Sequence, residues 1–100
     1  MIEVYLQQEV LDYLRTLPPE PKRALRQGIR ALSEEKGDIL PLTNELEGFH
    51  RLRVGRYRVI FHYEIEGSRR RIVCVYVAQR KWIYEVFLSR LLEDGLEQST

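Results

Sequence analysis

The stretch that decides the fold lies at residues 49–67 and reads FHRLRVGRYRVIFHYEIEG. Apolar and polar side chains alternate along it, which is the pattern of β-strands with one buried face. Gly55-Arg56 interrupts the alternation and Gly67-Ser68 ends it, and each pair has the glycine-first pattern of a type II′ hairpin turn. The stretch therefore predicts strands at 49–54 and 57–66, with a third strand at 69–78 beyond the second turn.

The rest of the chain supplies one more strand and three helices. Residues 2–6 alternate like a strand, while residues 8–17 and 20–36 place apolar side chains at helical spacing. Pro18 and Pro19 separate the two helices, and Gly37 ends the second. Residues 37–48 are a connecting loop, and a last helix begins at Ile83. We predict an α+β fold in the order β-α-α-β-β-β-α, with the two N-terminal helices on one face of a mainly antiparallel sheet.

Length and composition indicate one small domain. One hundred residues, 44% of them hydrophobic, suffice for a single core, which we expect at residues 1–94 with a frayed tail at 95–100. No apolar run approaches the roughly 20 residues that span a bilayer, and no secretory signal opens the chain. The single cysteine, Cys74, lies in an apolar strand. We therefore expect a cytoplasmic protein without a membrane partner, and a buried Cys74 rather than a reactive thiol.

The charges are segregated along the chain, although the net charge is only +1. Residues 1–48 and residues 83–100 each carry a net charge of −3, whereas residues 49–82 hold nine Lys/Arg against two Glu, a net of +7. Eight of those nine basic residues are arginine, whose planar guanidinium suits bidentate contact with phosphate. A focused positive field of this kind predicts a polyanionic partner such as nucleic acid.

Hairpin register predicts which of these arginines share a face. A two-residue turn at Gly55-Arg56 places Arg53 opposite Arg58, with Arg51 diagonal to them on the same side. Like charges directly across a strand pair destabilise it, so the placement makes sense when an anion completes it. A solvated sheet surface is the plainer alternative. Glu64–Arg71 and Glu66–Arg69 are predicted cross-strand ion pairs.

The other residues of the three strands divide between two faces. The face that carries the three arginines also carries His62 and an apolar patch formed by Ile60, Val73 and Val75. We expect the last helix to cover part of this patch. The opposite face is predicted to be a core surface made of Leu52, Val54, Tyr57, Val59, Phe61, Tyr63, Ile72, Cys74 and Tyr76.

These residues resemble a known family. Residues 46–61 (LEGFHRLRVGRYRVIF) resemble the L-x-G-x-x-R-L-R-V-G-x-Y-R-V-I-Y signature of RelE/ParE toxins. Residues 75–84 resemble that family's later V-x-x-V-G-H-R-x-x-x-Y element, and Leu17-Pro18-Pro19 followed by a helix is similar to many members. Two departures stand out: Ala78-Gln79 replaces Gly-His, and arginines stand at 51 and 53, where the RelE-like subgroup often has lysine.

The resemblance implies a toxin that is neutralised by a cognate antitoxin. It implies an endoribonuclease that cleaves ribosome-bound mRNA without a metal or other cofactor. The catalytic residues carried over are Arg53, Arg58, Arg80 and Tyr84, and the expected RNA-binding residues are Arg51, Arg56, His62, Lys81 and Trp82. Guanidiniums would stabilise negative charge on the phosphate.

Several roles stay open from the sequence. Tyr84 is the candidate base, but it is equally a core aromatic, and Phe87 is its alternative counterpart. His62 is an alternative acid or base, or a structural partner of Glu64 or Arg71. Trp82 is either a base-stacking or a packing aromatic.

Two other functions also stay open. A ParE-like inhibitor of DNA gyrase would share the fold without catalysis. A degenerate toxin that only binds its antitoxin is the third possibility.

Overall fold

The computed structural model describes residues 1–79 and 83–99, and within the last helix it describes side chains as far as residue 94. The N-terminal half consists of β1 (Glu3–Leu6), α1 (Gln8–Arg15), α2 (Pro19–Ala31), the 3-10 turn η1 (Leu32–Glu34), β2 (Asp38–Pro41) and the 3-10 turn η2 (Asn44–Leu46). The C-terminal half consists of β3 (Phe49–Val54), β4 (Tyr57–Glu66), β5 (Arg69–Ala78) and α3 (Ile83–Ser99). The predicted fraying of residues 95–100 concerns dynamics and stays a prediction.

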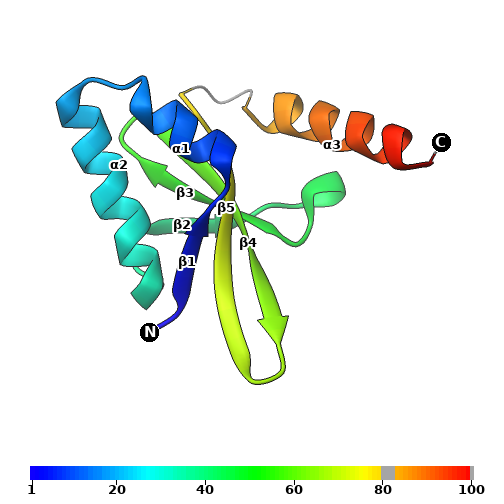
Figure 1. Cartoon of the computed structure of the whole chain (residues 1–100), viewed down its shortest axis with the longest axis horizontal. Helices are drawn as coiled ribbons and strands as arrows, with labels where there is room; N and C mark the ends of the chain where they lie inside the picture. Colours follow the sequence, from blue (N-terminus) through cyan, green and yellow to red (C-terminus); the bar gives the residue numbers. More distant parts are fainter. Residues whose placement is uncertain (80–82, 100) are drawn as a thin grey trace.

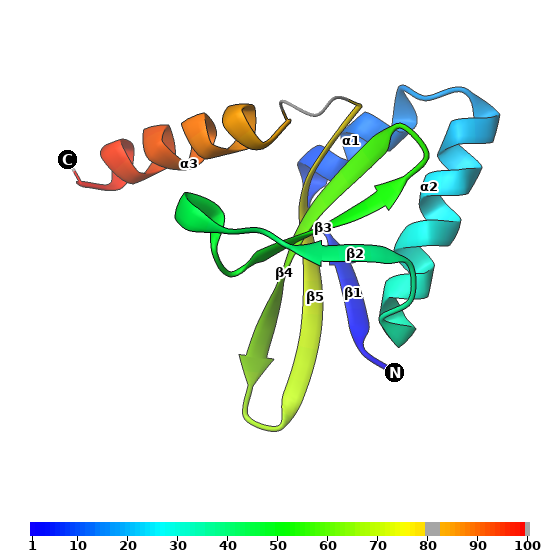
Figure 2. The ribbon, with the colours of Figure 1, turned by 180° about the vertical axis from the view of Figure 1, so that it is seen from behind.

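One five-stranded sheet organises the molecule, in the order β1-β5-β4-β3-β2. β1 runs parallel to β5, and the other neighbouring strands are antiparallel. The helices α1 and α2 lie beside the sheet in a V, and α3 leaves the far end of β5 on its own (Figures 1 and 2). The predicted α+β class, the mainly antiparallel sheet and the three central strands are confirmed.

Three boundaries differ from the sequence-based expectation. The segment that forms β2 was predicted to be loop, because its four residues include Pro41 and show no alternation of apolar and polar side chains. It forms a strand because it lies at the sheet edge, where proline is tolerated. The first helix ends at Arg15, because the segment before Pro18 cannot continue the helix easily. The second ends at Ala31, and the chain then turns through η1 to Glu35, which has a left-handed φ of 54°.

Apolar side chains form two cores, one on each face of the sheet. The first lies under α1 and α2 and is built from Val10, Leu14, Leu25, Ile29, Leu32, Leu52, Val59, Phe61, Ile72, Cys74 and Val77. The second lies under α3 and is built from Leu46, Ile60, Val73, Val75, Ile83 and Phe87. Because both faces are buried in the middle of the sheet, a one-residue slip of β4 would expose one core and bury charges in the other.

One residue of the predicted core surface lies on the wrong face. Tyr76 was expected under the two N-terminal helices, but it packs with the second core, under α3. The cause is a β-bulge: Ile60 pairs with Tyr76, whereas Phe61 pairs with Cys74, so one extra residue of β5 interrupts the alternation. Val77 consequently joins the first core.

No helix in the described part of the chain is both long enough and apolar enough to cross a membrane.

Close packing of α2 on β3 predicts a cost for a side chain at Gly28. A Cβ atom there would lie 2.7 Å from Cγ2 of Val54. We expect Gly28→Val to lower the free energy of unfolding by about 1–3 kcal/mol, although valine favours helix over glycine. Urea unfolding measures the change. Ala24→Val, at an exposed position of α2, is the control and should cost about 0.7 kcal/mol at most. Equal stability of Gly28→Val and the parent would contradict the packing.

Burial predicts an inert cysteine. The Cys74 side chain is fully buried in the first core, and burial raises the pKa of its thiol to about 12. We expect the folded protein at neutral pH to react with dithionitrobenzoate only as fast as the chain unfolds, because the thiolate is the reactive form. In urea the same thiol should react at once. Rapid reaction of the native protein would show that Cys74 is accessible.

Candidate functional site

The arginine face, which we define as Arg51, Arg53 and Arg58 on β3 and β4, has the predicted register. Val54 pairs with Tyr57, Arg53 with Arg58, and Arg51 with Ile60. Gly55, the first residue of the turn, has a positive φ of 59°, which glycine adopts without strain. Residues directly opposite in such a pair have Cβ atoms roughly 5 Å apart, so the fold holds two guanidinium stems side by side.

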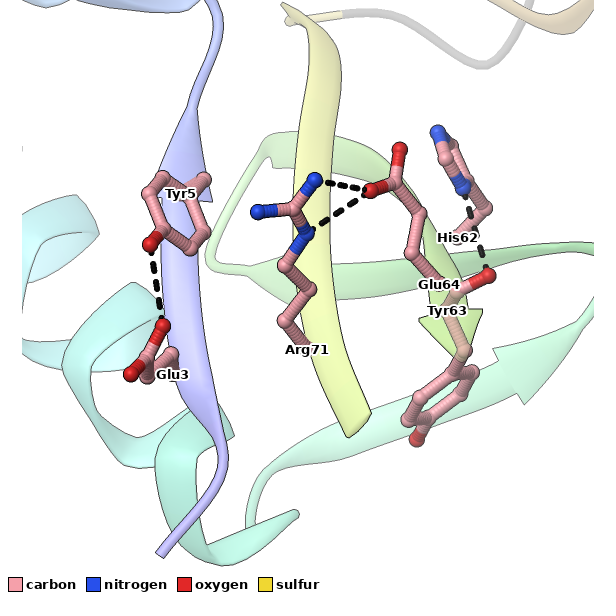
Figure 3. A network of polar contacts seen from close by, with 6 residues as sticks. All are labelled: Glu3, Tyr5, His62, Tyr63, Glu64 and Arg71. Atoms are coloured by element: carbon pink, nitrogen blue, oxygen red, sulfur yellow. Dashed lines mark hydrogen bonds and ion pairs between the residues drawn. The ribbon is translucent and has the colours of Figure 1, made fainter. Parts of the chain in front are cut away.

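Ion pairs neutralise the arginines next to the β4–β5 turn, at the opposite end of β4 from the β3–β4 turn. Three consecutive arginines on β5 each have an acidic partner from a different element: Arg69 with Glu3 at 3.3 Å, Arg70 with Glu35 at 3.5 Å and Arg71 with Glu64 at 2.6 Å. Figure 3 shows the Arg71 guanidinium reaching across to the Glu64 carboxylate. The hydrogen bond from Arg71 to Glu64 raises the pKa of Arg71, which fixes its charge further.

These contacts confirm one predicted ion pair and correct the other. Glu64–Arg71 is present as expected. Arg69 lies opposite Glu66 in the register, but its ion pair is with Glu3 on β1. The reason is topological: β1 lies parallel beside β5, and the sequence alone did not reveal that pairing.

Arg51 is also engaged within the protein. Its Nη1 lies 3.3 Å from both the backbone oxygen and the carboxylate of Asp38, and its side chain is 14% exposed. Asp38 stands on β2, the strand that the sequence did not predict, and this explains why the partner was missed. In this structure Arg51 therefore ties the edge strand to β3.

Arginines without an acidic partner among the described residues lie at the β3–β4 turn. Within the described part of the chain, Arg53, Arg56 and Arg58 form no ion pair. Arg53 donates a hydrogen bond from Nε to the backbone oxygen of Gly55 at 3.3 Å, and Arg56 is exposed at the tip of the turn. Arg58 is half-buried and lies opposite Ala78, near the end of β5. The segment of net charge +7 thus contributes a compact set of three unpaired arginines.

His62 lies on the same face as the arginines but further along β4. Its ring packs edge-on against Phe49, with 5.7 Å between ring centroids. Its Nδ1 lies 3.4 Å from the Tyr63 backbone oxygen, a contact drawn in Figure 3. His62 stands four positions beyond Arg58, which corresponds to roughly 13 Å along the strand. It is therefore not adjacent to the Arg53–Arg58 pair.

Tyr84 and Phe87, the two alternatives for the candidate base position, lie in the first turns of α3. Phe87 is a buried core residue between Phe49 and Tyr76, with ring centroids 5.1 and 5.8 Å away. Tyr84 is half-buried and lines a groove of about 400 Å³ against η2, together with Leu42, Leu46 and Leu88. Neither Arg53 nor Arg58 lines that groove.

Arg80, Lys81 and Trp82 lie outside the described residues. Among those that are described, no group of three His, Cys, Asp or Glu side chains is arranged to hold a metal ion. The site as described is therefore a group of arginines without acidic partners among the described residues, at one end of the sheet.

Comparison with solved structures identifies the fold. No protein-family model matches the chain, and no curated protein matches it by sequence. The toxin–antitoxin complex RelBE2 from Mycobacterium tuberculosis matches with a TM-score of 0.67 and 27% identity, covering 79% of this chain and 98% of that one. The archaeal RelE–RelB complex from Pyrococcus horikoshii matches with a TM-score of 0.59 and 26% identity, covering 80% and 96%.

A third structure shares the fold at lower identity. The YoeB/ParE toxin from Agrobacterium tumefaciens matches with a TM-score of 0.63 and 15% identity over 79% of this chain and 99% of that one. The matched chains are thus covered almost completely. The two matches at 27% and 26% identity support assignment of the chain to the RelE/ParE superfamily of toxins.

Proposed function

We propose that this protein is the toxin of a toxin–antitoxin module and that it cleaves ribosome-bound mRNA at the arginine face. The observation that carries the proposal is the Arg53–Arg58 cross-strand pair, which has no acidic partner among the described residues. Two like charges in this position oppose folding by a few tenths of a kcal/mol or more. A phosphate between them would turn that repulsion into two charge-assisted contacts.

The reaction that suits these groups is transesterification within the RNA. The ribose 2′-oxygen forms a bond to the adjacent phosphorus, and the bond from phosphorus to the 5′-oxygen of the next nucleotide breaks. The proton of the 2′-hydroxyl passes to a base, and the leaving 5′-oxygen takes a proton from an acid. The products are a 2′,3′-cyclic phosphate and a 5′-hydroxyl end.

Charge stabilisation is the role that we assign to Arg53 and Arg58. The pentacoordinate phosphate carries more negative charge than the starting diester, and guanidiniums placed beside it stabilise that charge. Arginine holds its proton far above neutral pH, so proton transfer belongs to another group. Tyr84 remains the proposed base, acting with Arg80 from the segment that follows β5.

A protein partner is part of the same proposal. The solved relatives from Mycobacterium tuberculosis and Pyrococcus horikoshii are complexes of a toxin with its antitoxin. We propose an antitoxin for this chain, with an acidic amphipathic segment that covers the arginine face. Such a segment would neutralise the unpaired charge at the β3–β4 turn while the toxin is stored.

Replacement of Arg58 tests the nuclease directly. We expect Arg58→Ala to abolish growth arrest while leaving the circular dichroism spectrum unchanged, because Arg58 forms no ion pair with the residues that the structure describes. Brief expression followed by mapping of mRNA 5′ ends should show cuts within codons for the parent and none for the variant. Arg23→Ala, which removes an exposed arginine from α2, is the control and should stay toxic.

Two outcomes would contradict the proposal. Intact messages together with inhibited supercoiling by DNA gyrase would establish the gyrase inhibitor instead. Absence of both activities, with a stable antitoxin complex, would identify a degenerate toxin.

Salt dependence measures the phosphate contacts themselves. Binding to a 2′-O-methyl RNA, which lacks the attacking hydroxyl, should weaken with salt because counterions are released. Each of Arg53→Ala and Arg58→Ala should reduce the slope of log K against log salt by about 0.7. Arg71→Ala removes an arginine that is already paired with Glu64, so its slope should match that of the parent. Equal slopes for all four proteins would rule out phosphate contacts at the pair.

A further inference from the structure

A row of three charged residues crosses the sheet beside the β3–β4 turn. Asp38 on β2 pairs in register with Arg53 on β3, and Arg53 pairs with Arg58 on β4. Residues directly opposite one another point to the same face of a sheet, with Cβ atoms roughly 5 Å apart. A carboxylate therefore stands next to the proposed phosphate site, on the edge strand of the sheet (Figure 2).

Asp38 does not pair with the arginine that it faces. The Asp38 carboxylate lies 3.3 Å from Nη1 of Arg51, the diagonal neighbour, and the same Nη1 donates a hydrogen bond to the Asp38 backbone oxygen at 3.3 Å. Arg53 donates its hydrogen bond to the Gly55 backbone oxygen instead. Asp38 thus holds Arg51 at two points and leaves Arg53 without an acidic partner among the described residues.

The Arg51 guanidinium keeps one edge for another ligand. Asp38 engages Nη1 only, and within the described part of the chain Nε and Nη2 of Arg51 donate no hydrogen bond. Nε and Nη2 together form one of the forks with which arginine contacts phosphate. The Arg51 side chain is far less exposed than that of Asp38, so water and salt screen the cation less than the carboxylate.

We infer that Asp38 is a positioning residue of the proposed reaction, because it fixes Arg51 as a third guanidinium for the RNA backbone beside Arg53 and Arg58. The inference rests on the proposed nuclease function and deepens it. A side chain that is held in place beforehand need not be ordered when RNA binds or reacts. The carboxylate itself repels phosphate, so Asp38 lowers RNA affinity while it raises the rate of cleavage.

The test is a split between RNA affinity and cleavage rate. Asp38→Asn keeps the shape of the side chain and the backbone contact but removes the negative charge. It should bind 2′-O-methyl RNA at least about twofold more tightly than the parent, because a repelling charge is gone. Its single-turnover rate constant for a defined short mRNA on purified ribosomes should fall at least about fivefold, because Arg51 is held less firmly. Urea unfolding confirms that the variant is folded.

A second variant shows whether Asp38 acts through Arg51. Arg51→Gln should cleave slowly, and the addition of Asp38→Asn should then change the rate constant by less than about twofold. If Asp38 only held the edge strand in place, Asp38→Asn would slow cleavage equally with and without Arg51.

Asp12→Asn is the matched control for the loss of one carboxylate. Asp12 is an exposed acid on α1, where it forms an ion pair with Arg15 at 3.6 Å. Because α1 packs on the other face of the sheet, RNA affinity and cleavage rate should stay within a factor of about two of the parent. Equal effects of Asp12→Asn and Asp38→Asn would overturn the inference. So would unchanged or weaker RNA binding by Asp38→Asn, or a loss of rate that persists in the Arg51→Gln background.

The parent protein separates failure of this inference from failure of the proposed function. A parent that cleaves ribosome-bound message, with Asp38→Asn cleaving at the same rate, overturns the inference and leaves the proposed function standing. A parent that cleaves no message overturns the proposed nuclease, and the inference falls with it.

Discussion

The cross-strand placement of Arg53 against Arg58 depends on the tight turn at Gly55 and Arg56, and the rest of the structure holds that placement rigidly. Burial of apolar side chains specifies the register of a strand pair and so opposes any slip that would relieve the repulsion. Here Leu52 and Val59 are buried under α1 and α2, while Ile60 is buried under α3. The register is therefore fixed from both sides, and the repulsion persists in the folded protein.

Several arginines of the described chain have structural roles. Arg51, Arg70 and Arg71 have acidic partners on neighbouring elements, so they hold β2, η1 and β4 in place. α3 is fixed by Phe87 in the second core and by Arg90, which pairs with Glu9 at the start of α1 and lies 5.5 Å from the Tyr76 ring centroid. Among the described residues, basic side chains without an acidic partner are concentrated at the β3–β4 turn and along α2.

The central strands were predictable because alternation and glycine turns are local signals. Arg53–Arg58 and Glu64–Arg71 followed from counting outward from Gly55 and Gly67. Tyr76 was misplaced because a β-bulge leaves no local mark in an apolar run such as residues 72–78. The partners of Arg51 and Arg69 were missed because β2 and the parallel β1–β5 pairing bring together residues far apart in the sequence.

We propose that the unfavourable Arg53–Arg58 pair is retained because it binds phosphate. A double-mutant cycle with Arg53→Thr and Arg58→Thr, read as free energies of unfolding and as affinities for 2′-O-methyl RNA, tests this proposal. We predict a repulsive coupling of about 0.2–1 kcal/mol in the free protein, so each single threonine variant is at least as stable as the parent. In RNA binding we predict a favourable coupling, with most of the affinity lost in either single variant. Attractive coupling in the free protein, or independent effects on RNA affinity, would contradict the claim.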